Sequence, residues 1–272
     1  MKKTAVFIPD TGIRYPDNPG DHMITPEKIS DFTLDADYPF LDRSPQFRFR
    51  SGLIYLGIFV LVFVLNRLRF GLKIEGRDIL RKHRRLLKDG AMTVSNHVLR
   101  WDFLCVLQAV RFRRLYYPAW KENLMGRDRN LIRWTGGIPV PEEIHLIRYF
   151  NRAFDELHEK KKWFHVFPEA CRWDYFRPIR PFKKGMFTMA YRYNIPVIPL
   201  AFSYRKPWGP YALLNRLRKK NLPLVTLRIG EPILPNATMG RKEAVEKMRR
   251  LCHAKIVELA GIQDNPYPCD AD

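Results

Sequence analysis

The strongest constraint on the fold is an alternation of short β-type runs and amphipathic helical segments over the last two thirds of the chain. The β-type runs cover residues 91–95, 138–140, 163–167, 196–203 and 222–229. Helical periodicity follows at residues 101–110, 142–161 and 184–193, and again after Gly240. Strands and helices that take turns in this way predict an α/β domain whose sheet is largely covered by helices.

The turn after the first of these strands holds a histidine and an aspartate five positions apart, in the run NHVLRWD at 96–102. Five residues of an ideal helix turn through about 500°, which would leave the two side chains about 140° apart. They meet only if His97 lies in the turn before the helix, and the cap-type residues Ser95 and Asn96 allow this. Asp102 would then bond one imidazole nitrogen while the other removes a proton from a hydroxyl. The alternative is a structural histidine with no chemical role.

Three further motifs follow this one in order. They read GGIPV at 136–140, VFPEACR at 166–172 with a trailing PFKKG at 181–185, and IPVIPL at 195–200. The four together resemble the glycerolipid acyltransferase family. Its ordered blocks are Asn-His-x4-Asp, Gly-x-Ile-x-Val, Phe-Pro-Glu-Gly-Thr-Arg with Phe-Lys-x-Gly, and Val-Pro-Val-Ile-Pro. The resemblance covers residues 71–231.

The resemblance implies a mixed sheet flanked by helices and an O-acyltransferase. The acyl donor would be acyl-CoA or acyl carrier protein, and the acceptor a lysophospholipid, first of all 1-acyl-sn-glycerol 3-phosphate, which would give phosphatidate in phospholipid biosynthesis. Another lysolipid acceptor, such as an ornithine lipid or a glycolipid, stays open. No cofactor is expected. The four cysteines show no metal-type spacing, so no metal site is expected either.

The resemblance also assigns roles to site residues. His97 would be the general base and Asp102 its orienting partner. Glu169 and Arg172 would lie in the acceptor pocket, where the planar guanidinium of Arg172 suits a phosphate. A mutual ion pair of Glu169 and Arg172 is the alternative. Asn96 would either orient the turn through backbone hydrogen bonds or polarise the thioester.

Lys183 and Lys184 are candidates for a headgroup or carrier contact, or are solvated charges. The chain departs from the family pattern after Val140, where Pro141 and Glu142 replace a basic residue. This departure puts 1-acyl-glycerol 3-phosphate in doubt as the acceptor. Arg133 is the candidate replacement; otherwise it is a surface charge.

A second departure places Ala170 and Cys171 where the family has Gly-Thr. The extra methyl and the thiol would reshape the pocket. Cys171 also raises the alternative of a covalent acyl-enzyme, with the neighbouring Arg172 lowering the pKa of the thiol.

An uninterrupted apolar run at 52–65, flanked on both sides by arginines, divides the chain. As a helix the run would be about 21 Å long, against a hydrocarbon core of about 30 Å. We expect an irregular arm at 1–50, a membrane-associating segment at 51–70, an acyltransferase domain at 71–265 and a tail at 266–272. The catalytic domain is expected on the cytoplasmic side. A buried core helix is the alternative for the apolar run.

The formal charge of +20 implies an anionic partner. Basic clusters at 111–114 and 216–220 would suit nucleic acid, but no recognised nucleic-acid module accompanies them. A phospholipid membrane is therefore the expected anionic surface, and no nucleic acid is expected. The resemblance implies the lysophospholipid acceptor and acyl-CoA or acyl carrier protein as the other partners. A lipid-binding relative without activity is a further alternative, which the complete set of site residues disfavours.

Overall fold

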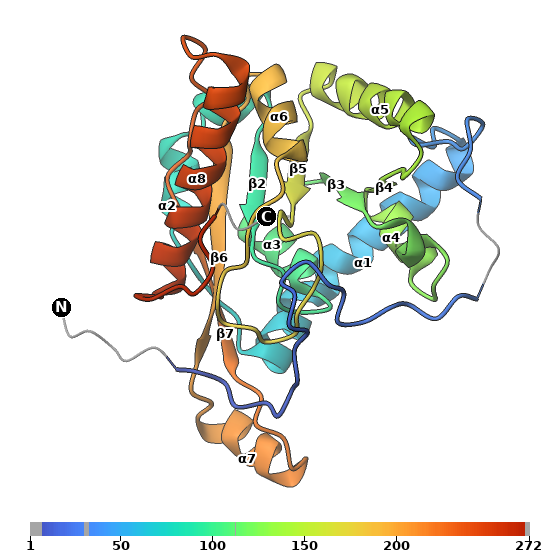
Figure 1. Ribbon diagram of the computed structural model, residues 1–272. Coiled ribbons are helices and arrows are strands. Elements are labelled where there is room, and N and C mark those ends of the chain that lie inside the picture. Colours follow the sequence, from blue (N-terminus) through green and yellow to red (C-terminus); the bar gives the residue numbers. More distant parts are fainter. Residues whose placement is uncertain (1–6, 30–32, 112, 270–272) are drawn as a thin grey trace.

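A computed structural model of the 272-residue chain describes residues 7–29, 33–111 and 113–269. Its seven strands form one sheet in the order β1-β7-β6-β2-β5-β3-β4 (Figure 1). Every neighbouring pair is parallel except β6 and β7, which are antiparallel. The predicted mixed sheet is confirmed.

Five of the seven strands follow the predicted runs, and β2 and β5 lie side by side near the centre, with Val94 opposite Val166. The sequence missed β1, which is only three residues long, and β3, which contains Pro118 and is only partly buried. The strands are β1 Lys73–Glu75, β2 Met92–Ser95, β3 Leu115–Ala119, β4 Gly137–Pro139, β5 Trp163–Val166, β6 Val197–Arg205 and β7 Leu224–Ile229.

Helices cover both faces of the sheet. One apolar core joins the sheet to α5, α6 and α8, and a second joins it to α1 and α3, as the largely covered sheet predicted. Three 3₁₀ turns, η1 Leu86–Asp89, η2 Lys121–Leu124 and η3 Ile144–Leu146, complete the regular structure. The helices are α1 Pro45–Phe70, α2 Arg77–Lys82, α3 Asp102–Ala109, α4 Arg129–Trp134, α5 Ile147–Glu159, α6 Gly185–Arg192, α7 Gly209–Leu217 and α8 Arg241–Ala260.

Helix α1 is longer than the apolar run that marked it. It begins at Pro45, inside the segment expected to be irregular, because the Ser44 side chain accepts a hydrogen bond from the Phe47 N–H. It ends at Gly71, whose left-handed conformation caps it. Its 26 residues span about 39 Å rather than the expected 21 Å.

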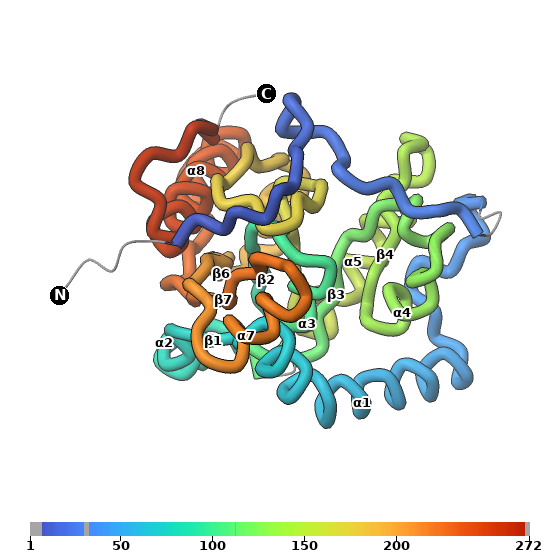
Figure 2. The backbone as a smooth tube through the Cα atoms, turned by 90° about the horizontal axis from the view of Figure 1, so that it is seen from below, coloured from blue at the N-terminus to red at the C-terminus, as the bar shows by residue number. Residues whose placement is uncertain are grey.

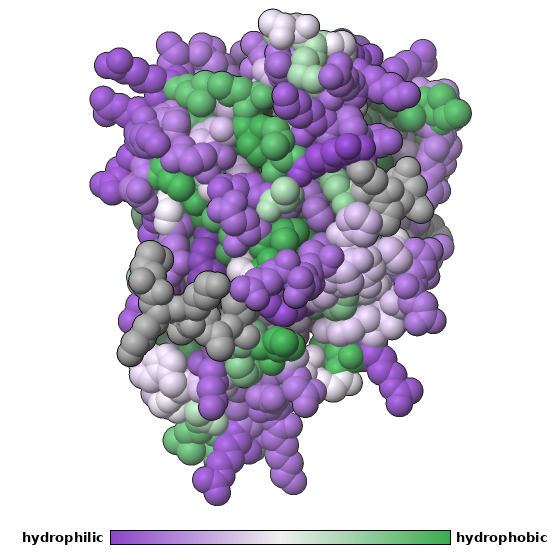
Figure 3. All heavy atoms as spheres, turned by 60° about the vertical axis from the view of Figure 1, so that its left-hand side comes forward, coloured by the Kyte–Doolittle hydropathy of each residue, from purple (hydrophilic) through white to green (hydrophobic). Residues whose placement is uncertain are grey.

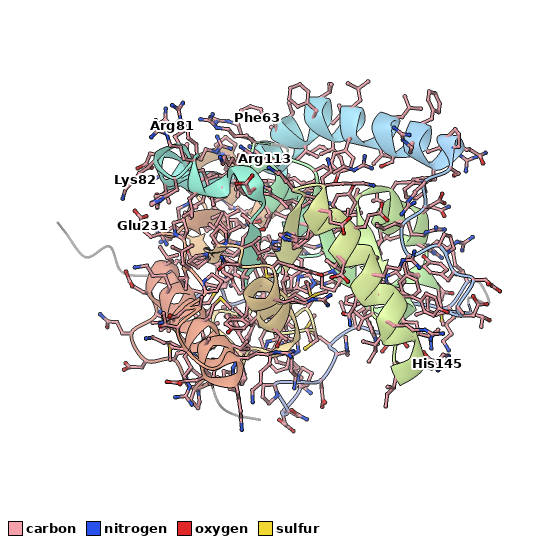
Figure 4. All side chains as sticks on the ribbon, turned by 90° about the horizontal axis from the view of Figure 1, so that it is seen from above. Phe63, Arg81, Lys82, Arg113, His145 and Glu231 are labelled. Atoms are coloured by element: carbon pink, nitrogen blue, oxygen red, sulfur yellow. The ribbon has the colours of Figure 1, made fainter. Side chains whose placement is uncertain are left out.

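One side of α1 packs on the sheet and the other is open. Ile58, Val62 and Phe70 are buried, and Phe63 lies on the outer side (Figure 4). Ten large apolar residues of α1 are at least half exposed: Phe49, Leu53, Leu56, Phe59, Val60, Leu61, Phe63, Val64, Leu65 and Leu68. By length and composition α1 could cross a membrane. The alternative of a buried core helix does not fit this exposure.

The side of the molecule that carries α2 and α8 is mostly hydrophilic, with apolar side chains in small separate groups (Figure 3). Next to α8, the segment expected to be a tail is held to the domain. Arg249 Nη1 donates to the carbonyl oxygens of Phe182 and Cys269, both at 2.8 Å. Residues 270–272 lie outside the described residues.

The chain before α1 runs across the domain without helix or strand over residues 7–29 (Figure 2). Trp173 Nε1 donates to the Asp21 carbonyl at 2.8 Å, and the Ile29 N–H donates to the Met125 carbonyl at 3.0 Å. The segment therefore joins the loop after β5 to the turn before α4. The parts of the expected arm at 1–6 and 30–32 lie outside the described residues.

Candidate active site

The turn between β2 and α3 brings His97 and Asp102 together. His97 precedes the helix and Asp102 is its first residue, with Nδ1 of the imidazole 2.7 Å from Asp102 Oδ2. Asp102 is 1% exposed, and the same oxygen accepts the backbone N–H groups of Val98 and Leu99 at 3.0 and 3.2 Å. Because a carboxylate only accepts, Nδ1 carries the proton and Nε2 is left as the basic nitrogen.

The imidazole of His97 is also fixed by stacking. The ring of Phe167 lies parallel to it, with 3.9 Å between centroids and 16° between planes. Because the side chain of His97 is only 21% exposed, it has little freedom to leave the hydrogen bond to Asp102. Phe167 belongs to the third motif but had no predicted role.

Asn96 is fully buried and uses both ends of its amide on the backbone of β6. Its Oδ1 accepts the Phe202 N–H at 2.8 Å, and its Nδ2 donates to the Phe202 carbonyl at 3.3 Å. This arrangement anchors the turn to the sheet. It favours the orienting role that the sequence left open over polarisation of a thioester.

Glu169 forms a buried ion pair, but its partner is Arg180 rather than Arg172. The Nη2–Oε2 distance is 3.0 Å and both side chains are 1% exposed. The Arg180 N–H donates to Glu169 Oε1 at 2.9 Å, and the His97 N–H donates to Oε2 at 3.0 Å. Glu169 therefore holds the backbone of the histidine, and the alternative of a Glu169–Arg172 pair does not form.

The departure at residues 170–171 has a clear structural consequence. Ala170 adopts φ of +64°, a left-handed conformation that favours the glycine of the family pattern. Cys171 is 1% exposed, and Arg180 Nη1 donates to its sulfur at 2.7 Å. Burial raises the pKa of the Cys171 thiol, although Arg180 lowers it in part. A buried, protonated thiol is a poor nucleophile, so the geometry disfavours the covalent alternative.

His97 opens onto a cavity of about 660 Å³. A smaller cavity of about 310 Å³ adjoins it, and both are lined by His97 and Arg172. Arg172 Nε lies 2.8 Å from Asp174 Oδ1. Burial raises the pKa of the Asp174 carboxyl, which Arg172 opposes. One wall of the larger cavity is apolar and comes from β3, α4 and α5: Tyr117, Pro118, Ala119, Leu131, Ile132, Ile147 and Phe150.

Comparisons with known proteins agree with this geometry. A family model described as Acyltransferase matches residues 71–203. The solved structure of the 1-acyl-sn-glycerophosphate (LPA) acyltransferase PlsC from Thermotoga maritima shares the fold, with a TM-score of 0.53 and 22% identity over 83% of this chain and 86% of that one. A comparison with curated protein sequences gives no significant match.

The fold brings some of the predicted residues to the cavities and leaves others away from them. Lys183 lines the larger cavity, whereas Lys184 is the N-cap residue of α6 and lines neither. The Arg133 guanidinium lies 3.4 Å from Asp42 and stacks over Tyr38, outside both cavities. The structure therefore does not bring Arg133 to the site as a replacement for the missing basic residue.

Arg180 and His22 belong to the surroundings of the site and were missed from the sequence. Arg180 immediately precedes the PFKKG motif, and this position next to a family motif is the sequence signal that could have marked it as a partner of Glu169. His22 lies in a segment with no periodic pattern, and no sequence signal marked it. Within residues 7–29, 33–111 and 113–269, no three His, Cys, Asp or Glu side chains meet as metal ligands would.

Proposed function

We propose that this protein is a membrane-associated O-acyltransferase. It moves a fatty acyl group from the thioester of acyl-CoA or acyl carrier protein to the hydroxyl of a lysophospholipid, with conversion of 1-acyl-sn-glycerol 3-phosphate to phosphatidate as the leading reaction. The observation that carries the proposal is the His97–Asp102 pair, 2.7 Å apart, on a cavity of the acyltransferase domain. The structurally similar PlsC is a 1-acyl-sn-glycerophosphate acyltransferase, which supports the choice of acceptor.

The chemistry needs one base that later acts as an acid. Nε2 of His97 takes the proton of the acceptor hydroxyl as its oxygen attacks the thioester carbonyl. The buried carboxylate of Asp102 stabilises the imidazolium that results. When the tetrahedral intermediate collapses, the carbon–sulfur bond breaks and the proton passes to the leaving thiolate. The products are the ester and a free thiol, and no group of the protein is consumed.

The surroundings of the pair fit both substrates. The apolar wall from β3, α4 and α5 suits a fatty acyl chain, and Arg172 offers a planar cation for a phosphate. The exposed apolar side of α1 suits a bilayer, from which lysolipid substrates would enter. We place the catalytic domain on the cytoplasmic side of that membrane; the wide spacing of the four cysteines along the sequence fits a reducing compartment.

The test is the release of thiol from palmitoyl-CoA or palmitoyl carrier protein by the detergent-solubilised chain with 1-acyl-glycerol 3-phosphate. The variant His97→Ala is expected to lower the rate by about 10²–10⁴-fold, the usual contribution of a positioned base. His145→Ala, which removes an exposed histidine on η3 (Figure 4), is the matched control and should keep the wild-type rate.

Assays with other lysolipids decide between 1-acyl-glycerol 3-phosphate and a different acceptor for the same reaction. Turnover only with a lyso-ornithine lipid or a glycolipid would keep the His97 mechanism and replace the acceptor. Equal rates for wild type and His97→Ala with every active acceptor would contradict the proposed role of the pair. Binding of lysolipid without thiol release from either donor would favour a lipid-binding protein without activity.

A further inference from the structure

The segment before α1 is fastened to the loop after β5 beside the active site. Several hydrogen bonds hold it: among them, Arg180 Nη1 donates to the Pro19 carbonyl at 3.0 Å, Trp173 Nε1 donates to the Asp21 carbonyl at 2.8 Å, and the Tyr15 hydroxyl donates to the Asp174 carbonyl at 2.9 Å. The ring of Tyr15 also stacks on Trp173 at 5.6 Å. Arg180 is the cation of the buried pair with Glu169, so the same side chain supports the His97 backbone and this segment.

This segment supplies one wall of the smaller cavity. The other lining residues come from the η2–α4 region, from the His97 turn and from the loop after β5; Figure 2 shows the segment passing these elements. Five residues of the segment line this cavity: His22, Ile24, Thr25, Pro26 and Glu27. The segment therefore contributes five of the residues that line the smaller cavity beside His97.

His22 lies where the two cavities meet. It lines both of them together with His97, Arg100, Trp120 and Arg172. Its imidazole stacks on the indole of Trp120 with 3.7 Å between centroids and 16° between planes, so the ring is held in place. Burial lowers its pKa, which leaves a neutral imidazole with one donor and one acceptor at neutral pH.

The smaller cavity is rich in cations. Arg100 and Arg127 are largely exposed and paired, with Asp128 at 2.8 Å and Glu27 at 3.5 Å. Arg172 is different, because its side chain is only 22% exposed. Its Nε lies 2.8 Å from Asp174 Oδ1, and the guanidinium has two terminal nitrogens besides. These nitrogens are a fork of the kind that binds two oxygens of one phosphate.

We propose that the segment 19–27 completes the acceptor site: the smaller cavity receives the phosphate-bearing headgroup of the lysolipid, and His22 contacts that headgroup beside Arg172. The fatty chains then lie in the larger, partly apolar cavity, and the acceptor hydroxyl reaches His97 where the two cavities join. This inference rests on the proposed function and adds to it the place of the headgroup and a contact residue that the four motifs do not contain.

The first test compares Michaelis constants for two acceptors that share an acyl chain, 1-acyl-glycerol 3-phosphate and the phosphate-free 1-acyl-glycerol. His22→Ala should raise the KM for the phosphate-bearing acceptor about tenfold, the loss expected for one hydrogen bond to a charged group. The KM for the phosphate-free acceptor and for the acyl donor should stay within about twofold of wild type, a margin well below the effect of that hydrogen bond. His22→Gln retains a donor and should recover part of the loss, and His145→Ala should match wild type.

Thermal melting of each variant shows that it is folded. An equal rise of KM for both acceptors, or a fall of kcat with KM unchanged, would mean that His22 only covers the site, and would overturn the inference. Binding of 1-acyl-glycerol 3-phosphate, measured by equilibrium dialysis below its critical micelle concentration, separates the inference from the proposed function. Weaker binding to His22→Ala than to His145→Ala, without any thiol release, would uphold the headgroup site and refute the transferase proposal. Equal binding would overturn the headgroup site whatever the turnover.

Discussion

Two buried carboxylates contact His97, and they do different work. Asp102 lies five residues along the chain and bonds the imidazole at 2.7 Å, whereas Glu169 lies in another motif and accepts the backbone N–H at 3.0 Å. Glu169 is neutralised by Arg180, while the hydrogen-bond partners of Asp102 Oδ2 are His97 and two backbone N–H groups. The first carboxylate controls the chemistry of the side chain and the second controls the position of the main chain. A substitution that affects Asp102 should therefore lower mainly the catalytic rate, and one that affects the Glu169 ion pair should lower mainly the stability of the fold.

The largest effect is expected from Asp102→Asn. The amide oxygen can still accept the N–H groups of Val98 and Leu99, so the turn should remain folded. It cannot stabilise an imidazolium, so we expect kcat to fall by about 10²–10⁴-fold. Steady-state kinetics and a melting curve on the same sample measure both quantities. A loss below tenfold would mean that Asp102 is structural only.

Arg180→Met should act mainly on stability, whereas Asp102→Asn acts mainly on kcat. It leaves the Glu169 charge buried and unpaired, which typically costs about 3–5 kcal/mol of unfolding free energy. It also removes the donor to the Pro19 carbonyl. Urea denaturation measures the change. Lys82→Met breaks an exposed pair with Glu231 (Figure 4) and should change the stability by no more than about 1 kcal/mol. Equal losses for the two variants would contradict the buried ion pair.

The smallest expected change in unfolding free energy comes from Ala170→Gly, which tests the backbone conformation of the loop that carries Glu169. Ala170 has φ of +64°, so Ala170→Gly should raise the free energy of unfolding by up to about 1 kcal/mol. The same replacement in an exposed helical position, Ala254→Gly in α8, should lower it by about 0.5–1 kcal/mol. The opposite signs are the readout. A loss of stability at both positions would argue against the left-handed turn.

Much of the fold could be predicted from the sequence because it depends on local periodicity. The alternation of strands and helices predicted a covered α/β sheet, and the five strands it marked are the longer or more buried ones. Strand β1 was missed because two of its three residues are charged and none is fully buried, so it lacks the apolar character that marked the equally short β4. The length of α1 was missed because its arginine-rich ends interrupt the apolar run without ending the helix. Helix boundaries depend on caps such as Ser44 and Gly71, which hydropathy does not report.

The sequence by itself determined the pairing of His97 with Asp102, because their separation spans one turn and the entry to one helix, so a local geometry fixes it. The tertiary structure alone decided which cation faces Glu169. The loop after β5 folds back on itself, and the buried charge is satisfied by Arg180, eleven residues away, instead of by Arg172, three residues away. The same holds for His22, which reaches the site only because its segment crosses the folded domain. Short spacings restrict geometry directly, whereas contacts between distant segments depend on the packing of everything between them.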